Sequence, residues 1–182
     1  MSARTLIRNA QNHLEETITI KGWVDVTRVQ GKVAFFDFRD RSGKIQGVVF
    51  GKPEVLEIAH TLKQEYVVEV TGVVHKRAEK MVNPKVDNGD IEIEITAMTV
   101  LAEAAPMPFD MSVDGYNLDL TTELDHRALT LRHPRLQAIF KVQAVIIDSF
   151  REYLKSQEFF EFQAPSITPA TAEGGAEVFQ VN

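Results

Sequence analysis

The sequence contains no cysteine, so disulfide bonds and cysteine-ligated metal sites are excluded. It has no apolar run of the roughly 20 residues that a membrane-spanning helix needs, and its N-terminus lacks the apolar segment of a signal peptide. Positive charge is also scarce, since 20 Lys and Arg stand against 26 Asp and Glu and the formal net charge is −6. These absences favour a cytoplasmic protein without a membrane partner. They also indicate that any nucleic-acid site is local and shape-specific, because bulk electrostatic attraction is missing.

The hydrophobic pattern predicts an all-β domain at the start of the chain. Alternating and β-branched segments indicate five strands, at residues 17–28, 32–39, 44–50, 66–75 and 91–101. An amphipathic helix is predicted at 54–64, between the third and fourth strands, and a short helix at 1–15. This β-β-β-α-β-β order is that of the OB-fold, a five-stranded barrel that binds oligonucleotides through the face of its second and third strands.

One face of the second and third strands carries the candidate binding residues. Side chains alternate between the two faces of a strand, and the predicted inward set is Ala34, Phe36, Phe38, Ile45, Gly47 and Val49. Phe35 and Gln46 therefore face outward, near Arg39 and Lys44. An exposed ring can stack on an unpaired base, an amide can hydrogen-bond to a base edge, and the two cations can hold phosphate. The alternative is that Phe35 caps a barrel end and Gln46 is an ordinary surface residue, since isolated surface aromatics are common.

A proline-containing segment follows the predicted barrel. Each proline of residues 104–108 removes a backbone donor and interrupts regular structure. We therefore predict a barrel domain at 1–103, a linker or hinge at 104–132, and the start of a second domain at 133–182. That second domain opens with a long helix from Pro134 to about residue 157, which carries a broad apolar stripe. Because only an extended segment and a Gly-Gly loop follow, we expect the second domain to be incomplete in this chain.

Four segments together resemble the class II aminoacyl-tRNA synthetases of the aspartate, asparagine and lysine subgroup, most closely the aspartyl enzymes of archaeal and eukaryotic type. GWV...R...GK..FFDFRDRSGKIQ is similar to the anticodon-binding barrel of that family. PMPFD, followed by ELDHRALTLRHPRLQAIFKV, resembles the hinge and the entry to the α+β catalytic domain. Phe159, Phe162 and Pro165 resemble motif 1, and ATAEGGAEVFQV resembles the loop that follows it. The resemblance covers nearly the whole chain.

The resemblance implies an anticodon-binding role for four residues of the barrel. Phe35 matches the aromatic residue that stacks on an anticodon base, and Gln46 matches the amide that hydrogen-bonds in the anticodon loop. Arg28 matches a basic position of the first strand. Glu92 matches an acidic anticodon contact, although it could equally be an ordinary outward-facing strand residue.

Two further roles are implied in the second domain. Glu173 matches a glutamate that engages the α-ammonium group of the amino-acid substrate, for which a carboxylate is the natural partner; the alternative is a solvated loop glutamate. Pro165 matches the motif 1 proline at a dimer interface, so the resemblance implies a homodimer. The alternative is that the apolar helix is buried within its own domain. Glu158 departs from the family, which usually has glycine there.

The implied activity is that of an ATP-dependent ligase that joins aspartate to tRNA, with this chain supplying anticodon recognition and motif 1. The sites for ATP and Mg²⁺ are expected beyond Asn182, so no catalytic residue and no metal ligand is assigned here and the chain alone is expected to be inactive. The aspartate tRNA is the expected partner, and charging of the asparagine tRNA is left open. The alternatives are an asparaginyl enzyme, which shares the barrel, and a non-catalytic RNA-binding paralogue.

Overall fold

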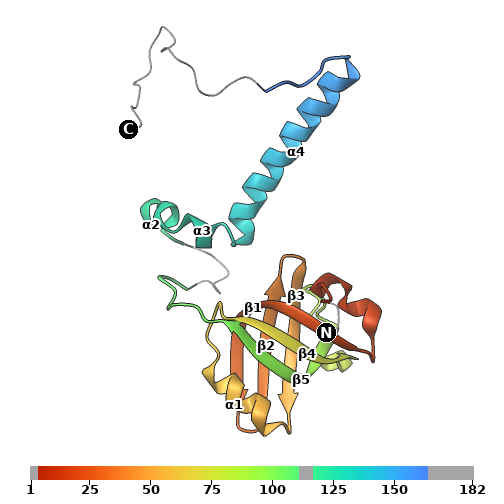
Figure 1. Cartoon of the computed structure of the whole chain (residues 1–182), viewed down its shortest axis with the longest axis vertical. Helices are drawn as coiled ribbons and strands as arrows, with labels where there is room; N and C mark the ends of the chain where they lie inside the picture. Colours follow the sequence, from red (N-terminus) through yellow and green to blue (C-terminus); the bar gives the residue numbers. More distant parts are fainter. Residues whose placement is uncertain (1–3, 111–116, 164–182) are drawn as a thin grey trace. The chain divides into compact units, whose positions relative to one another are not determined.

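The computed structural model describes residues 4–110 and 117–163 and divides into two units, Met1–Gly115 and Tyr116–Asn182. Each unit is described by itself (Figure 1). The domain boundaries predicted at either end of residues 104–132 stay predictions.

The first unit is a closed barrel of five strands. The strands are β1 (Thr17–Gln30), β2 (Val33–Asp40), β3 (Gly43–Phe50), β4 (Val67–Lys76) and β5 (Ile91–Ala102). Their order around the barrel is β1-β2-β3-β5-β4, closed by the pairing of β4 with β1, and only β3 and β5 pair in parallel. Helix α1 (Pro53–Thr61) lies between β3 and β4. This arrangement confirms the predicted OB-fold.

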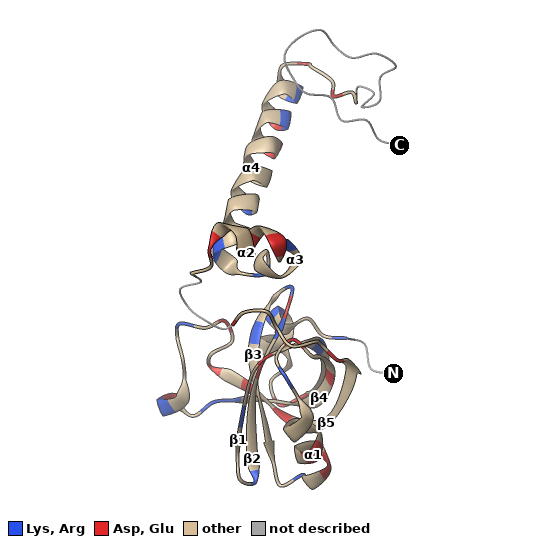
Figure 2. Ribbon diagram, turned by 90° about the vertical axis from the view of Figure 1, so that its left-hand side faces the viewer, with Lys and Arg blue, Asp and Glu red and all other residues tan. Residues whose placement is uncertain are grey.

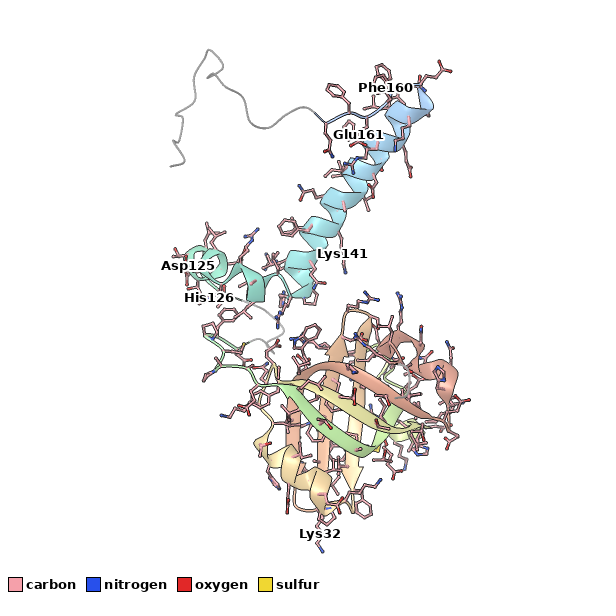
Figure 3. All side chains as sticks on the ribbon, in the orientation of Figure 1. Lys32, Asp125, His126, Lys141, Phe160 and Glu161 are labelled. Carbon is pink, nitrogen blue, oxygen red and sulfur yellow. The ribbon has the colours of Figure 1, made fainter. Side chains whose placement is uncertain are left out.

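The predicted alternation of β2 and β3 is confirmed by burial. The side chains of Phe36 and Phe38 are fully buried, and their rings stack with centroids 5.4 Å apart. The turns at the two ends of β2 lie at opposite ends of the barrel, as Figure 3 shows for Lys32 in the β1–β2 turn. In β1 the alternation breaks, because the register with β2 shifts between Val24 and Val26. Such a bulge leaves Asp25 unpaired in the ladder and almost buried.

The N-terminal segment differs in helix type from the prediction for residues 1–15. It forms a 3₁₀ helix, η1 (Ile7–His13), whose Ile7 and Ala10 are fully buried against the barrel. A 3₁₀ run of seven residues is longer than usual for this tighter helix. The predicted polar loop after β4 contains a second 3₁₀ turn, η2 (Glu79–Met81).

The second unit is helical in the part that the structure describes. Two short helices, α2 (Leu120–Asp125) and α3 (Arg127–Thr130), occupy residues that were predicted as hinge. They precede α4 (Pro134–Ser156), which agrees with the predicted long helix. Asp119 caps α2 by accepting a hydrogen bond from the backbone N–H of Thr122 at 2.9 Å. None of the described helices is long and apolar enough to cross a membrane.

Helix α4 exposes most of its apolar side chains within its own unit. Only Leu136 is buried, and the exposed apolar residues are Ile139, Phe140, Val142, Val145, Ile146, Ile147, Phe150, Tyr153 and Leu154. Beyond the helix, Glu158 has a positive φ of 65°. A positive φ is the conformation that favours glycine, so the departure from the family pattern falls where the backbone would suit that residue. Pro165 and Glu173 lie outside the described residues.

Candidate nucleic-acid interface

The outer face formed by β1, β2, β3 and β5 brings together the four residues that the sequence assigned to anticodon binding. Arg28 on β1 pairs with Phe35 on β2, and Gln46 on β3 pairs with Glu92 on β5. Residues opposite one another in neighbouring strands project from the same face of a sheet. Phe35 is half-buried rather than fully exposed. A ring in that position is held by its neighbours and still presents surface to a base.

Glu92 links two polar side chains at one edge of this face. The Gln46 side-chain amide donates a hydrogen bond to Glu92 Oε2 at 3.3 Å, and Arg77 Nε lies 3.5 Å from the same oxygen. Arg77 also donates to the backbone carbonyl of Gly89 at 3.4 Å, and its side chain is only 12% exposed. Sequence reasoning missed Arg77. Its position directly after the fourth predicted strand, in the loop that borders the binding face, was the available signal.

Arg28 and Asp37 form a second polar pair on the face, with Arg28 Nη2 3.3 Å from Asp37 Oδ2. Burial raises the pKa of the Asp37 carboxyl above its ordinary value of 3.8, and the nearby Arg28 guanidinium lowers it in part. The Asp37 carboxylate is therefore a partly buried charge on this face. Its ion pair with Arg28 restricts the movement of the Arg28 side chain.

A hollow of about 790 Å³ opens beside these pairs. Its strand side is lined by Asp25, Arg28, Asp37, Lys44 and Gln46, and its other side by Arg77 and the loop before β5. The volume lies within the usual range of ligand sites, and the lining is rich in donors and acceptors. Phe35 is not in the lining, but it lies next to the hollow through its pairing with Arg28. An unpaired nucleobase could enter the hollow while a neighbouring base stacks on the ring.

The two cations that were expected to hold phosphate differ in availability. Arg39 is an internal ion-pair partner, because its guanidinium contacts Asp25 at 3.4 Å and Glu65 and lies 5.3 Å from the Trp23 ring centroid. Its side chain is only 16% exposed, so the expectation of phosphate binding by Arg39 is wrong. The physical reason is the bulge that buries Asp25 beside it. Lys44 is half-exposed and contacts Asp25 at 2.5 Å, at the rim of the hollow.

The surface of the barrel is not uniformly basic. Figure 2 shows basic and acidic residues interspersed over it, in keeping with the negative net charge. Among the described residues no three His, Asp or Glu side chains are grouped so that they could hold a metal ion. The face is therefore equipped for local recognition by shape and hydrogen bonding.

Comparisons with known proteins agree with this architecture. Residues 18–101 match the family of OB-fold nucleic acid binding domains, under the model for the tRNA anticodon-binding domain. Residues 119–182 match the family of class II tRNA synthetases for D, K and N. The chain is 40% identical over 167 residues to the aspartate–tRNA ligases of Staphylococcus aureus strains Newman and N315. That alignment covers 90% of this chain and 28% of each relative.

Solved structures give the same family at lower identity. A protein from Leishmania major Friedlin, named as a putative aspartyl-tRNA synthetase, superposes with a TM-score of 0.84 at 24% identity, over 94% of this chain and 36% of that one. The asparaginyl-tRNA synthetase from Pyrococcus horikoshii, complexed with asparaginyl-adenylate, superposes with a TM-score of 0.78 at 26% identity, over all of this chain and 41% of that one.

The chain combines an OB-fold nucleic acid binding domain with the start of a class II tRNA synthetase of the D, K and N group, and it belongs to that family. Within the family it is similar to the amino-terminal part of the aspartate–tRNA ligases. It spans a little over a quarter of the length of the curated relatives, at 28%. Those relatives are bacterial, so the archaeal and eukaryotic type stays a prediction.

Proposed function

We propose that this chain reads the tRNA anticodon for an aspartate–tRNA ligase. Such an enzyme activates aspartate with ATP and then transfers the aspartyl group to the 3′ end of its tRNA. The observation that carries the proposal is the gathering of Arg28, Phe35, Gln46 and Glu92 on one barrel face, beside a hollow of nucleotide size. The 40% identity to aspartate–tRNA ligases supports the choice of amino acid.

The chemistry of the face assigns a task to each side chain. Phe35 offers a ring on which one anticodon base stacks. Gln46 donates one side-chain N–H to Glu92, which leaves its carbonyl oxygen and its second N–H for a base edge. Glu92 accepts, so it suits the amino or imino group of a base. Arg28, exposed over half of its side chain, is placed to contact a phosphate or a base acceptor.

The catalytic half of the proposal rests on the family. ATP and Mg²⁺ are proposed because the chain matches the class II synthetases. No catalytic step is assigned to the described residues. Glu173 is proposed to engage the α-ammonium group of aspartate, and Pro165 to lie at a homodimer interface. The exposed apolar stripe of α4 supports that dimer. The proposed compartment is the cytoplasm, where tRNA is charged.

Two alternative functions compete with this proposal. An asparaginyl enzyme is favoured by the structural similarity to the Pyrococcus horikoshii protein, at 26% identity. A non-catalytic RNA-binding paralogue would keep the barrel and lose the ligase activity. Charging assays with aspartate and asparagine on the protein encoded by the whole gene separate all three.

The anticodon proposal is tested by measuring the binding of this chain to the aspartate tRNA and to a copy with a substituted anticodon. We expect the substituted tRNA to bind more weakly. The variant Phe35→Ala should weaken binding of the aspartate tRNA by roughly 1–3 kcal/mol, the usual cost of one lost stack, whereas Phe35→Tyr keeps the ring and should restore most of it. Equal binding of both tRNAs, together with no effect of Phe35→Ala, would refute anticodon reading by this barrel.

A further inference from the structure

The N-terminal helix η1 is fixed to the turn between β2 and β3. The backbone N–H of Ile7 donates to Asp40 Oδ2 at 3.1 Å, and the backbone N–H of Arg8 donates to Ser42 Oγ at 3.1 Å. The side chain of Asp40 is fully buried. Two segments more than 30 residues apart in sequence are thereby held side by side at one end of the barrel.

This junction brings together two exposed arginines, Arg8 on η1 and Arg41 in the turn. Within the described residues neither side chain forms an ion pair, whereas nearby Arg4 lies 3.6 Å from Asp40. Ile7 and Arg8 are anchored through their backbone N–H groups. The Arg8 guanidinium therefore takes no part in this anchoring. Both guanidinium groups are exposed and are therefore available to an anion from solution.

The arginine pair adjoins the hollow of the binding face. The side-chain amide of Asn88, which lines the hollow, donates to the backbone carbonyl of Ile7 at 3.3 Å and to that of Lys44 at 3.1 Å. One amide therefore ties η1, the start of β3 and the wall of the hollow together. Lys44 lines the hollow and is held by Asp25 at 2.5 Å. The lining also contains Asp25, Asp37 and Asp87, the carboxylates that an anion must avoid.

We propose that Arg8 and Arg41 bind the phosphodiester backbone of the RNA strand whose bases enter the hollow. This inference rests on the proposed function, since it extends the same RNA path beyond the base-reading residues. Guanidinium groups are well suited to phosphate oxygens. Contacts of this kind position a strand without reading its sequence, so the pair would add affinity that does not depend on the anticodon.

The test is the salt dependence of tRNA binding by the full chain and by the double variant Arg8→Gln, Arg41→Gln. Each phosphate contact contributes about 0.7 to 0.9 to the slope of log K against log salt concentration. Loss of two contacts should therefore reduce the magnitude of that slope by about 1.5. The weakening should be equal for the aspartate tRNA and the anticodon-substituted copy. The matched control is Lys52→Gln, Lys63→Gln, which removes two charges on either side of α1 and should leave the slope unchanged.

The outcomes separate this inference from the anticodon proposal. If the parent chain discriminates between the two anticodons but the arginine variant keeps the parent slope, the arginine contact is wrong and anticodon reading stands. If the lysine control lowers the slope as much as the arginine variant, the effect is general electrostatics and the inference is overturned. If the parent chain does not discriminate between anticodons, the proposed function fails, and the RNA path argued here fails with it. Unchanged circular dichroism of both variants excludes unfolding as the cause.

Discussion

The side-chain amide of Gln46 donates to the carboxylate of Glu92 at 3.3 Å, across the parallel pairing of β3 and β5. Arg77 approaches the same carboxylate at 3.5 Å. The Glu92 side chain is one-quarter exposed, so it is held between two polar partners and still reaches the solvent. The anticodon contact proposed for Glu92 therefore stays a prediction, which the following variant tests.

Replacing Glu92 by Gln should reduce anticodon discrimination. The change keeps the side-chain shape and removes the charge that contacts Gln46 and Arg77 and that is proposed to accept from a base. A hydrogen bond to a charged group contributes about 1.5–3 kcal/mol, so the ratio of dissociation constants for the substituted and aspartate tRNAs should fall by about tenfold or more.

The matched control for that change is Glu69→Gln. Glu69 lies on β4, where it pairs with Lys21 at 2.6 Å and lines no part of the hollow. Its variant should keep the parent discrimination ratio. An unchanged ratio in Glu92→Gln itself would remove Glu92 from the set of anticodon contacts.

Most of the barrel follows from local periodicity, but its internal ion pairs do not. The alternation in β2 and β3 correctly separates Phe36 and Phe38 from Phe35, because each strand's pattern is complete within eight residues. The burial of Arg39 depends on Glu65, which is 26 residues away. A local sequence pattern cannot reveal an ion-pair partner so far away along the chain.

The same limit applies to the binding face and to the chain after α4. Arg77 joins the face because the pairing of β4 with β5 brings it to Glu92, and the parallel pairing of β3 and β5 sets Glu92 beside Gln46. Glu158 looked like a departure from the family, and only the backbone angle of 65° reveals that its position adopts a conformation that suits glycine. Sequence resemblance therefore predicted the candidate site residues, while non-local pairing determined which charges beside them are available.

Asp37 should make stability depend on pH in the acid range. Burial raises the pKa of its carboxyl above 3.8 in the folded state, so the folded protein retains that proton to higher pH than the unfolded chain. Stability should then decrease as pH rises from about 3.8 through the raised pKa, and the loss should be complete above it. The variant Asp37→Asn removes this decrease and should unfold at a higher urea concentration than the parent at pH 7.

The pH dependence is measured as the urea midpoint between pH 3 and pH 7. Asp87→Asn is the control, because Asp87 is an exposed carboxylate on the other wall of the same hollow. The difference between parent and Asp37→Asn should grow with pH across the window. A constant difference at every pH would mean that Asp37 does not titrate with a raised pKa in the folded state.

Gly47 is required by packing inside the barrel. A Cβ atom at this position would lie 2.6 Å from Phe38 Cε2 and 2.9 Å from Ile95 Cδ1, and both of those side chains are fully buried. Gly47→Ala should therefore cost about 1–3 kcal/mol of unfolding free energy, the usual range for overpacking. Gly43→Ala is the control in the same strand, where the nearest atoms would be 3.8 Å away. Equal urea midpoints for the two variants would contradict the packing argument.

Asp40 should control both the attachment of η1 and the position of the arginine pair. Its buried carboxylate accepts from the backbone N–H of Ile7 at 3.1 Å and from the backbone N–H and hydroxyl of Ser42 at 2.7 and 2.6 Å. Asn in its place would turn an N–H₂ group toward one of these donors and leave that donor unsatisfied, at a cost of about 1–3 kcal/mol.

The expected result of Asp40→Asn is a lower urea midpoint, together with faster hydrogen exchange at the amide of Ile7. Asp90→Asn is the control, since Asp90 is exposed and, among the contacts described, its carboxylate accepts only from the Gln11 side chain at 3.3 Å. Because Arg8 is placed by the same junction, Asp40→Asn should also lower the salt slope of tRNA binding, although it removes no positive charge. A lower urea midpoint with an unchanged slope would mean that Arg8 reaches the RNA without the anchoring of η1.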